Sequence, residues 1–570
     1  MVWQETYEKW TKHSALNEDL RKQLDDLQGN EKELEDAFYK NLSFGTGGMR
    51  GVLGPGTNRM NIYTIRKAVA GLAKYIKSNV QYAENRGVAI AYDSRHMSKE
   101  FAVEAAKVLG AEGVRAYVFE SLRPTPVLSF AVRYLHAAAG IMITASHNPP
   151  EYNGFKVYNE DGGQAPLEEA EAIINEVNKI DKELDIPIKS EQELIENNLL
   201  EWIGEKVDKA YLAQLKTIQK QDVSGSDLEI VFTPLHGTAY HPVMDGLHQL
   251  GFRNIHVVEE QAKPDPEFST VSSPNPEEHQ AFEMAMRLGE KVDADILIGT
   301  DPDADRLGVA VKDADGAYQV LSGNQLGTLL MDYTLSQTEN LTNGKVIKTI
   351  VTTEMGRAVA NHYGVDTIDT LTGFKFIGEK MKQFESTDER FLFGYEESYG
   401  YLIGDFVRDK DAVQAAVAAC EVAHYWKQQG KTLLEALDIL YEKHGFYLEQ
   451  MKSLTLKGKE GAEQIATIME DIRLRPFTSL AGLKILAVED YQTSKRLLPI
   501  EDKEEDIILP QENVMKFLLE NEAWVCFRPS GTEPKIKSYF GVKTDSREES
   551  ETLIHAIQEE VEGRIASILN

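Results

Sequence analysis

Three aspartates stand at alternate positions in the string GTDPDADR, namely Asp301, Asp303 and Asp305. In an extended loop, side chains two positions apart lie on the same side of the chain, so the three carboxylates can converge on one hard cation. An EF-hand is excluded, because that loop needs glycine at its sixth position and glutamate at its twelfth, where this chain has Arg306 and Lys312. An acidic surface turn is the alternative, but the mutual repulsion of unpaired carboxylates favours a cation site.

A serine follows a predicted buried strand. The apolar run AGIMI predicts the strand, so Ser146 lies in a turn at the carboxyl end of that strand, where ligands bind in α/β folds. Pro149 and Pro150 stiffen the turn, because proline continues neither a strand nor a helix. His147 and Lys156 add two candidate proton carriers or phosphate contacts, so Ser146 is a candidate nucleophile. An ordinary turn with an N-capping serine is the alternative.

A glycine-rich loop, FGTGGMRG, carries Arg50. The loop does not match the nucleotide-binding pattern G-x-G-x-x-G, because the third glycine would fall at Arg50 and no predicted strand precedes the loop. The lysine and hydroxyl residue that end a P-loop are also missing from it. The loop therefore offers close approach of its backbone to a ligand together with one guanidinium, or it is a glycine turn with a surface arginine.

Two later stretches suit the recognition of a sugar phosphate. A carboxylate and a hydroxyl, Glu396 and Ser398, follow the apolar run FLF and can pair with sugar hydroxyls, which both donate and accept hydrogen bonds. The string RPSGT follows an apolar strand near the end of the chain, and its arginine, hydroxyls and backbone N–H groups can all donate to one phosphate. The residues of this predicted phosphate cradle are Arg528, Ser530, Gly531 and Thr532.

Alternating strands and helices must position these residues. The predicted strands are 88–91, 114–119, 141–144, 229–235, 255–258, 294–298, 346–351 and 365–371, and the helices between them are 100–109, 127–136, 241–250, 279–288, 355–363 and 377–384. A polar stretch of helical character at 166–216 separates the first unit from the second. Such alternation with short connections predicts β-α-β units and mixed or parallel sheets.

The predicted fold class is α/β, with three similar α/β domains in series and a smaller α+β domain at the C-terminus. The repeat breaks near residue 446, where strands near 453–456 and 523–527 and a helix at 549–569 are predicted. The expected domains are 1–205 with an N-terminal helical cap, 206–322 with the aspartates, 323–445 with the sugar-reading stretch, and 446–570 with the phosphate cradle.

Composition narrows the partners and the location. The 570 residues are 42% hydrophobic and 27% charged, which is typical of a soluble globular protein. A formal net charge of −31 argues against nucleic acid and anionic membrane surfaces as partners. Neither a signal peptide nor a spanning helix is predicted, which favours a cytoplasmic location. The two cysteines, Cys420 and Cys526, lie far apart in apolar sequence and are predicted to be reduced core residues.

The string TASHNPPEYNGFKVY, which contains Ser146, resembles the active-site loop of the α-D-phosphohexomutase superfamily, the phosphoglucomutases and phosphomannomutases. Further loops match the family in its order. The resemblance implies that Ser146 carries a phosphoryl group and that Arg50 faces it. It implies that the three aspartates and the phosphorylated serine bind Mg²⁺, and that the C-terminal domain is a mobile lid with a fold like that of the TATA-binding protein.

The resemblance also supplies candidate roles for the other motifs. Glu396 and Ser398 correspond to the sugar-reading loop of the family, and Lys410 matches a ligand-contacting lysine, with a surface ion cluster as the alternative. The candidate substrate contacts are Arg306, Thr372, Gly373, Lys375, Glu396, Ser398, Lys410, Arg528, Ser530, Gly531 and Thr532. The candidate catalytic residues are Ser146, Lys156, His147 and Arg50.

The activity implied is the interconversion of α-D-glucose 1-phosphate and glucose 6-phosphate through a phosphoserine, with glucose 1,6-bisphosphate as intermediate and activator. Pro302 and Ala304 stand where the family usually has glycine, which suggests a branch near the phosphopentomutases. Phosphopentomutase and phosphomannomutase activities are therefore alternatives. A serine-nucleophile phosphatase and a non-catalytic sugar-phosphate sensor are alternatives of other classes, and the sequence indicates no particular oligomeric state.

Overall fold

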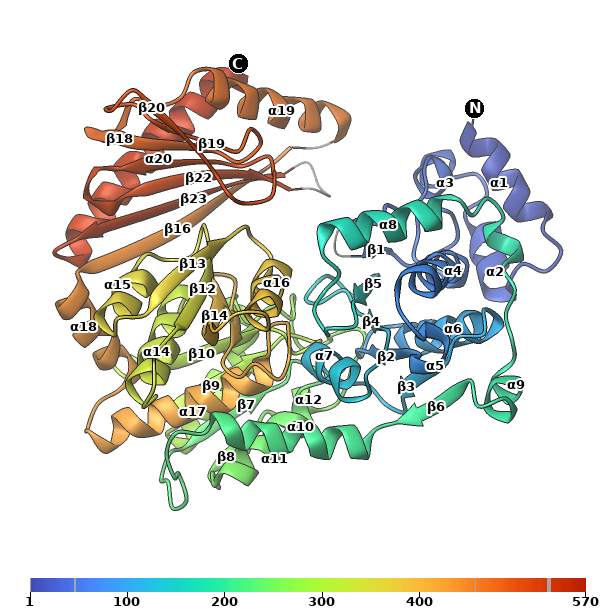
Figure 1. Cartoon of the computed structure of the whole chain (residues 1–570), viewed down its shortest axis with the longest axis horizontal. Coiled ribbons are helices and arrows are strands. Elements are labelled where there is room, and N and C mark those ends of the chain that lie inside the picture. Colours follow the sequence, from blue (N-terminus) through green and yellow to red (C-terminus); the bar gives the residue numbers. More distant parts are fainter. Residues whose placement is uncertain (1, 46–47, 457, 531–534, 570) are drawn as a thin grey trace. The chain divides into compact units, whose positions relative to one another are not determined.

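The computed structural model describes residues 2–45, 48–456, 458–530 and 535–569 (Figure 1). The chain forms two compact units, each built from two segments. Unit 1 comprises Met1–Gly323 and Phe374–Thr432, and unit 2 comprises Asn324–Gly373 and Leu433–Asn570. In the part of the chain that is described, no helix is both long and apolar enough to cross a membrane.

Unit 1 begins with three helices, α1 (Val2–Lys12), α2 (Glu18–Asp26) and α3 (Glu31–Phe38). They enclose a small apolar cluster centred on Trp10, whose ring makes edge contacts with Phe38 and Tyr63 at centroid distances of 5.7 and 5.4 Å. Tyr63 belongs to α4 (Ile62–Asn79), so these helices are anchored to the first α/β layer.

The first sheet of unit 1 has six strands in the order β1-β5-β4-β2-β3-β6 (Figure 1). The strands are β1 (Met49–Val52), β2 (Val88–Tyr92), β3 (Ala116–Phe119), β4 (Ala139–Ile143), β5 (Tyr152–Tyr158) and β6 (Leu200–Ile203). Strands β4, β2, β3 and β6 run parallel, whereas β5 is antiparallel to both of its neighbours. The sequence predicts β2, β3 and β4, but β6 interrupts the stretch 166–216 that was expected to be helical.

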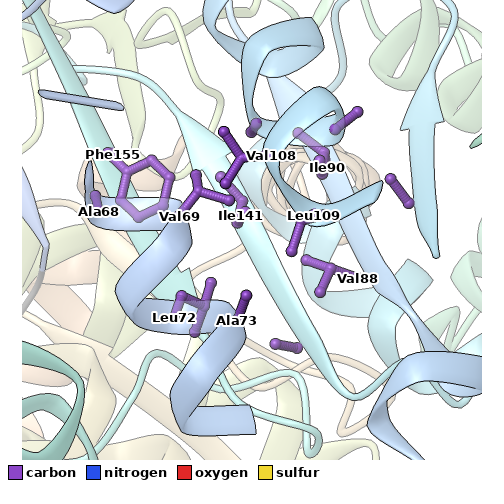
Figure 2. Packing of buried hydrophobic residues seen from close by; sticks show 14 of the residues in the cluster. Ala68, Val69, Leu72, Ala73, Val88, Ile90, Val108, Leu109, Ile141 and Phe155 are labelled. Carbon is purple, nitrogen blue, oxygen red and sulfur yellow. The ribbon is translucent and has the colours of Figure 1, made fainter. Parts of the chain in front are cut away.

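Helices pack on both faces of this sheet. The helices of this part of the chain, besides α4, are α5 (Ala83–Arg86), α6 (Ser98–Ala111), α7 (Thr125–Tyr134), α8 (Leu167–Asn178), the 3-10 turn η1 (Glu183–Asp185), α9 (Glu191–Glu196) and α10 (Glu205–Ile218). On one face, Val69 of α4 and Leu109 of α6 share a buried cluster with Ile141 of β4 (Figure 2). On the other face α7 approaches closely at Gly140, where a Cβ would lie 2.7 Å from Cγ2 of Val132. Each such buried aliphatic side chain contributes about 1.5–3 kcal/mol, so the strand that leads to Ser146 is held firmly.

The second sheet of unit 1 has the order β11-β10-β9-β7-β8. Its elements are β7 (Ile230–Thr233), α11 (Tyr240–Leu250), β8 (Ile255–Val257), α12 (Glu259–Ala262), η2 (His279–Phe282), α13 (Glu283–Val292), β9 (Ile296–Thr300), β10 (Leu307–Lys312) and β11 (Tyr318–Val320). Strands β7, β8 and β9 are parallel, so β7 and β9 end at the same edge. The aspartate loop follows β9 directly and therefore lies at that edge.

Unit 1 is completed by α16 (Phe374–Phe384), β14 (Arg390–Glu396), β15 (Gly400–Leu402) and α17 (Ala412–Gln428). Strands β14 and β15 form an antiparallel pair. Asp411 caps α17, because its carboxylate accepts the backbone N–H groups of Val413 and Gln414 at 3.0 Å each. The same carboxylate accepts the hydroxyl of Tyr211 in α10 at 2.8 Å, which ties α17 to α10.

Unit 2 combines a small α/β part with a large antiparallel sheet. The α/β part contains α14 (Gly323–Ser336), β12 (Gly344–Thr349), α15 (Met355–His362), β13 (Asp366–Thr370) and α18 (Leu433–His444), with β12 parallel to β13. The sheet has eight strands, β16-β23-β22-β21-β18-β19-β20 with β17 beside β18. Their bounds are β16 (Phe446–Thr455), β17 (Ser479–Leu480), β18 (Leu483–Asp490), β19 (Lys495–Leu498), β20 (Lys503–Asp506), β21 (Met515–Leu519), β22 (Trp524–Pro529) and β23 (Lys535–Thr544), with η3 (Glu520–Glu522). Helices α19 (Gly458–Leu474) and α20 (Arg547–Leu569) share the buried core of this sheet, which gives the α+β arrangement.

A buried lysine lies at the end of β12 in unit 2. The side chain of Lys348 has no exposed surface, and its Nζ lies 2.9 Å from Oε1 of Glu354 and 3.1 Å from Oδ1 of Asp369. Lys516 of β21 donates to the carbonyl of Ile350 at 2.7 Å, so the antiparallel sheet contacts the same corner. Buried charges of this kind are tolerated because they are paired.

Lys348→Met should lower the free energy of unfolding of unit 2 by about 1.5–3 kcal/mol, because the partly buried carboxylates of Glu354 and Asp369 lose one cation and keep the Arg357 guanidinium. Calorimetry of thermal unfolding measures the loss. Lys345→Met is the matched control on the same strand, since Lys345 pairs with Asp366, whose side chain is 78% exposed. Exposed pairs contribute about 1 kcal/mol or less, so equal losses in the two variants would show that burial does not set the effect.

Candidate active site

Ser146 lies immediately beyond the carboxyl end of β4, as predicted. Its side chain is almost fully buried, and its Oγ donates to Oδ2 of Asp301 at 2.8 Å. The ring Nδ1 of His147 lies 3.2 Å from the same Oγ. The serine hydroxyl therefore sits between a carboxylate and an imidazole, which is an environment suited to a nucleophile.

The backbone of Ser146 is strained. Its φ is +51°, in the left-handed region that L-residues other than glycine, asparagine and aspartate seldom adopt. This conformation costs about 1–2 kcal/mol, so the surrounding structure must hold it. The backbone N–H of Ser146 donates to Oγ1 of Thr144 at 2.9 Å, which is one part of that support.

The three aspartates converge as the alternation of the sequence predicts. Asp301, Asp303 and Asp305 are buried, and one carboxylate oxygen from each lies within 4.8 Å of the others. Oδ1 of Asp301 accepts the backbone N–H groups of Asp305 and Arg306 at 3.0 Å each, which folds the loop back on itself. The loop thus concentrates three acidic groups beside the serine hydroxyl.

Two ammonium groups face these carboxylates. Lys156 of β5 lies 2.9 Å from Oδ2 of Asp303 and 3.6 Å from Oδ2 of Asp305. Lys410 lies 2.9 Å from Oδ2 of Asp305. Lys410 therefore belongs to the aspartate cluster, and its contact with a ligand stays a prediction.

The donor set fits a hard divalent cation. Among the described residues, Oδ1 of Asp303 and Oδ1 of Asp305 are buried and have no hydrogen-bond partner. Buried oxygens without a partner cost free energy, and a cation bound to them would remove that cost. Oxygen ligands of this type favour Mg²⁺ or a similar ion over softer metals.

Pro302, in the aspartate loop, packs against the loop that follows β7. Gly237, in the loop after β7, lies so close that a Cβ there would be 2.4 Å from Cα of Pro302. The next residue, Thr238, donates its N–H and its hydroxyl to the carbonyl of Pro302 at 2.9 and 3.0 Å. The loop after β7 therefore supports the aspartate loop at Pro302.

Burial and neighbouring charges shift the pKa values of several groups in this site. Burial and the neighbouring carboxylates of Asp303 and Asp305 raise the pKa of Asp301 well above its usual range. Burial opposes ionisation of Asp303 as well, but the Lys156 ammonium outweighs it and lowers the pKa of that carboxyl. Burial, with the charge of Arg306, lowers the pKa of His147 well below its usual range. The imidazole is therefore neutral near pH 7 and able to accept a proton.

Other predicted residues of unit 1 approach the same site. Arg50 lies on β1, and its Nη1 donates to Oδ1 of Asn148 at 2.9 Å. Arg50 therefore reaches the loop that contains Ser146, residues 144–152, which is called the serine loop below. Glu396 is buried at the end of β14, and a Cβ at Gly400 would lie 2.3 Å from Cδ of Lys410 and 3.4 Å from Oε2 of Glu396. The side chains of Glu396 and Lys410 therefore both lie against Gly400, close to one another.

The stretch that contains Ser398 reaches the aspartate loop. The carbonyl of Tyr399 accepts the backbone N–H of Leu307, which follows Arg306 directly, at 3.1 Å. Arg306 itself pairs with Glu277. Lys375 is the second residue of α16, and its ammonium lies 5.0 Å from the ring centroid of Phe376.

Six predicted contacts belong to unit 2, and the structure describes four of them. The hydroxyl of Thr372 is buried without a hydrogen-bond partner among the described residues, and Gly373 follows it at the end of a segment of the unit. Nε of Arg528 donates to Glu512 at 3.2 Å, and the N–H of Ser530 donates to the carbonyl of Lys535 at 2.7 Å. Gly531 and Thr532 lie outside the described residues.

Sequence reasoning missed two buried side chains near the site. Thr125, at the start of α7, donates its hydroxyl to Oδ2 of Asp303 at 3.0 Å. Arg95 donates to the carbonyl of Ser146 at 2.7 Å. Both follow the carboxyl ends of parallel strands, β3 and β2, which is the position that singled out Ser146. That rule, applied to every strand of the sheet, would have found both.

A buried serine hydroxyl beside three carboxylates and two ammonium groups is an arrangement suited to phosphoryl transfer, in which positioning and fixed charges stabilise the transferring group. The chain belongs to the phosphoglucomutase/phosphomannomutase family. The family's models for α/β/α domains I, II and III match residues 41–184, 209–316 and 322–444. The predicted arrangement of three α/β domains in series, followed by a domain with an antiparallel sheet and helices, is thereby confirmed.

Curated relatives match almost the whole chain. A phosphoglucomutase of Staphylococcus haemolyticus is 41% identical over 515 residues, which are 90% of this chain and 93% of the relative. A phosphoglucomutase of Staphylococcus aureus (strain MRSA252) is 40% identical over 538 residues, 94% and 95% of the two chains. The predicted membership of the phosphohexomutases is therefore confirmed.

Solved structures show the same fold. A putative phosphomannomutase from Thermus thermophilus is 24% identical with a TM-score of 0.66, covering 92% of this chain and 99% of its own. The phosphoglucomutase pp63/parafusin of Paramecium, in an open form, is 17% identical with a TM-score of 0.67, covering 93% and 96%.

Proposed function

We propose that this enzyme is a phosphoglucomutase that interconverts α-D-glucose 1-phosphate and glucose 6-phosphate through phosphorylated Ser146. The observation that carries the proposal is the 2.8 Å contact between Oγ of Ser146 and Asp301 within the buried aspartate cluster. The curated relatives that match over 90% of this chain or more are phosphoglucomutases, which supports the choice of substrate.

Mg²⁺ is the cofactor that we propose for the aspartate cluster. Asp301, Asp303 and Asp305 would hold it, together with the phosphate on Ser146. When bound, the ion supplies positive charge against the phosphoryl group during transfer. The buried unpaired oxygens of Asp303 and Asp305 support this assignment.

The transfer itself follows from the side chains in place. A hydroxyl oxygen of the sugar phosphate forms a bond to the phosphorus on Ser146, and the bond from phosphorus to Oγ breaks. His147, 3.2 Å from Oγ, is placed to exchange a proton with the serine oxygen. One proton moves from the attacking hydroxyl to Oγ in this step. Lys156, which neutralises charge beside the aspartates as an ammonium, is the candidate carrier, because it can give its proton to Oγ and take the hydroxyl proton in its place; His147 is the alternative. Arg50 and Arg306 add positive charge near the transferring group.

Glucose 1,6-bisphosphate is the proposed intermediate and activator. The bisphosphate must turn over so that its other phosphate returns to Ser146. Glu396, Ser398, Lys375 and Lys410 are the proposed sugar and phosphate contacts of unit 1, with Thr372, Gly373, Arg528, Ser530, Gly531 and Thr532 proposed from unit 2. Water must be excluded while the bisphosphate turns, because phosphoserine would otherwise hydrolyse.

The proposed domains are 1–205, 206–322, 323–445 and 446–570. The ends of the three family matches, at residues 184, 316 and 444, support these boundaries. The last domain is the proposed lid over the sugar phosphate.

A direct experiment combines turnover with intact mass. The purified enzyme is incubated with glucose 1,6-bisphosphate and Mg²⁺, and its mass should rise by one phosphoryl group that maps to Ser146. Added α-glucose 1-phosphate should then be converted to glucose 6-phosphate. Stoichiometric release of inorganic phosphate in place of glucose 6-phosphate would instead identify a serine-nucleophile phosphatase.

Substrate choice gives a quantitative prediction. We expect kcat/KM for α-glucose 1-phosphate to exceed that for ribose 1-phosphate by at least about tenfold, or about 1.4 kcal/mol. Glu396 and Ser398 are the proposed hydrogen-bond partners of sugar hydroxyls, and a smaller sugar would leave such groups unpaired. Coupled assays with both substrates measure the ratio.

Ser398→Ala should reduce that preference. Ser386→Ala is the matched control, because the hydroxyl of Ser386 is exposed and donates to the carbonyl of Gln383 at 2.9 Å. Equal or better use of the pentose phosphate by the unaltered enzyme would favour the phosphopentomutase alternative that Pro302 and Ala304 suggest.

A further inference from the structure

One buried guanidinium binds the backbone of the serine loop, which follows β4 and contains Ser146 (residues 144–152). Arg95 follows β2, and its side chain has no exposed surface. Its Nη2 donates to the carbonyls of Ser146, at 2.7 Å, and Asn148. Its Nη1 donates to the carbonyls of Pro149 and Tyr152 at 2.8 and 3.1 Å. A single side chain therefore binds the backbone of the loop at its beginning, middle and end.

Arg95 is itself fixed on two sides. Nε of Arg95 lies 3.4 Å from Oδ2 of the buried Asp93, and Oδ1 of Asp93 accepts the backbone N–H of Arg95 at 2.9 Å. The guanidinium also lies 4.9 Å from the ring centroid of Phe268, which comes from the segment between α12 and η2. A planar cation held by a carboxylate and an aromatic ring has little freedom to move.

The same carboxylate secures the far end of the loop. Oδ1 of Asp93 accepts the hydroxyl of Ser98 at 2.7 Å, and Oγ of Ser98 accepts Nδ2 of Asn153 at 2.9 Å. The backbone N–H of Asp93 donates to the carbonyl of Ile143 at 3.0 Å, which joins β2 to the strand that leads into the loop. Asp93 and Arg95 thus fix both ends of the segment that contains the candidate nucleophile.

We propose that Arg95 is a positioning residue for phosphoryl transfer: by binding these four carbonyls it keeps Ser146 in the left-handed conformation that directs Oγ at the aspartate cluster. Arg95 contacts the backbone of the loop, so it acts through Ser146 and not on the substrate. Small displacements of a reacting group reduce rates strongly, by about a hundredfold for 1 Å. The proposal rests on the proposed function for its kinetic part, but not for its structural part.

The test compares Arg95→Ala with a milder variant and a matched control. Arg95→Ala should lower kcat about a hundredfold with little change in KM, because sugar-phosphate contacts remain while the nucleophile is misplaced. Arg95→Lys keeps the charge but cannot bind four carbonyls, so kcat should fall by about tenfold in a stably folded protein. Millimolar methylguanidinium should restore at least part of the activity of Arg95→Ala and none of Arg95→Lys.

Arg86→Ala is the matched control. Arg86 precedes β2 and also donates to backbone carbonyls, those of His136 and Ala137 at 2.9 and 3.2 Å, but at the opposite end of the strand from the serine. Its removal should leave kcat unchanged, and methylguanidinium should have no effect on it.

Hydrogen exchange gives a readout that does not depend on activity. In Arg95→Ala, backbone amides of residues 145–153 should exchange at least about tenfold faster, while those of β2 and β4 keep their rates. Unchanged exchange in the loop would overturn the positioning role. So would a rise in KM together with a fall in kcat and faster exchange throughout the domain. If the unaltered enzyme shows no mutase turnover while loop exchange still accelerates in the variant, the Arg95 clamp stands and the proposed function falls.

Discussion

Ser146→Ala should abolish mutase turnover, with a loss of at least about 10⁴-fold, because removal of a covalent nucleophile removes the step that every later one requires. The mass increment produced by glucose 1,6-bisphosphate should vanish with it. The fold should be retained, since the substitution removes only the hydroxyl and its contacts with Asp301 and His147. The change in unfolding free energy should stay within about 1 kcal/mol. Coupled turnover, intact mass and thermal unfolding measure these three expectations.

Ser272→Ala is the control for that experiment. Ser272 is exposed and donates to the side chain of Gln280 at 2.8 Å, away from the β4 loop. It should keep full turnover and accept one phosphoryl group. A Ser146→Ala enzyme that still becomes phosphorylated would show that another side chain is the nucleophile.

Asp303→Asn should lower kcat by about 10²–10³-fold while KM changes little. The substitution removes one charge from the cluster and one of the two unpaired buried oxygens, and charge that acts on the transferring phosphoryl group affects the transition state more than the ground state. The metal affinity should fall as well, which titration with Mn²⁺ followed by electron paramagnetic resonance measures directly.

Asp313→Asn is the control for the aspartate series. Asp313 lies just after β10 and accepts the backbone N–H groups of Asp315 and Ala317 in an exposed turn, at 3.0 and 2.9 Å. Its substitution should alter neither kcat nor Mn²⁺ affinity. If Asp303→Asn raised KM and left kcat untouched, the cluster would be a substrate-binding element and not part of the transfer.

The strands that carry the site could be predicted because their sequences are continuously apolar. The runs before Ser146 and before Asp301 form strands that are buried in mixed sheets, and such runs are recognisable without knowledge of their partners. The ends of those runs then placed Ser146 and the aspartates where the structure has them, beyond β4 and β9. Lys156 was expected in a loop, but it lies on the antiparallel strand β5. The sequence of β5, YNGFKVY, mixes polar and apolar residues without a regular alternation, so the strand was not predicted.

The strand-end rule could have singled out Arg95 as a residue near the site, but its contacts could not be predicted from local pattern. The contacts of Arg95 are to backbone carbonyls more than fifty positions along the chain, and backbone acceptors leave no mark in a sequence. The pairing of Lys410 with Asp305 likewise depends on how α17 begins and what its cap binds. Such contacts are consequences of topology, so they become visible only when the strands are placed.

The division of each compact unit between two separate segments has a consequence for synthesis. During synthesis, Ser146 and the three aspartates leave the ribosome early. Lys410, the partner of Asp305, emerges only after the unit 2 segment Asn324–Gly373. That segment carries Lys348 and must itself wait for Leu433–Asn570 before its corner with Lys516 can form. The nascent chain therefore passes through a stage in which Asp305 lacks Lys410 and apolar surface is exposed, when chaperones and proteases compete for it. Slowed translation between residues 324 and 432 should for this reason reduce the yield of folded enzyme more than the same delay within residues 88–143.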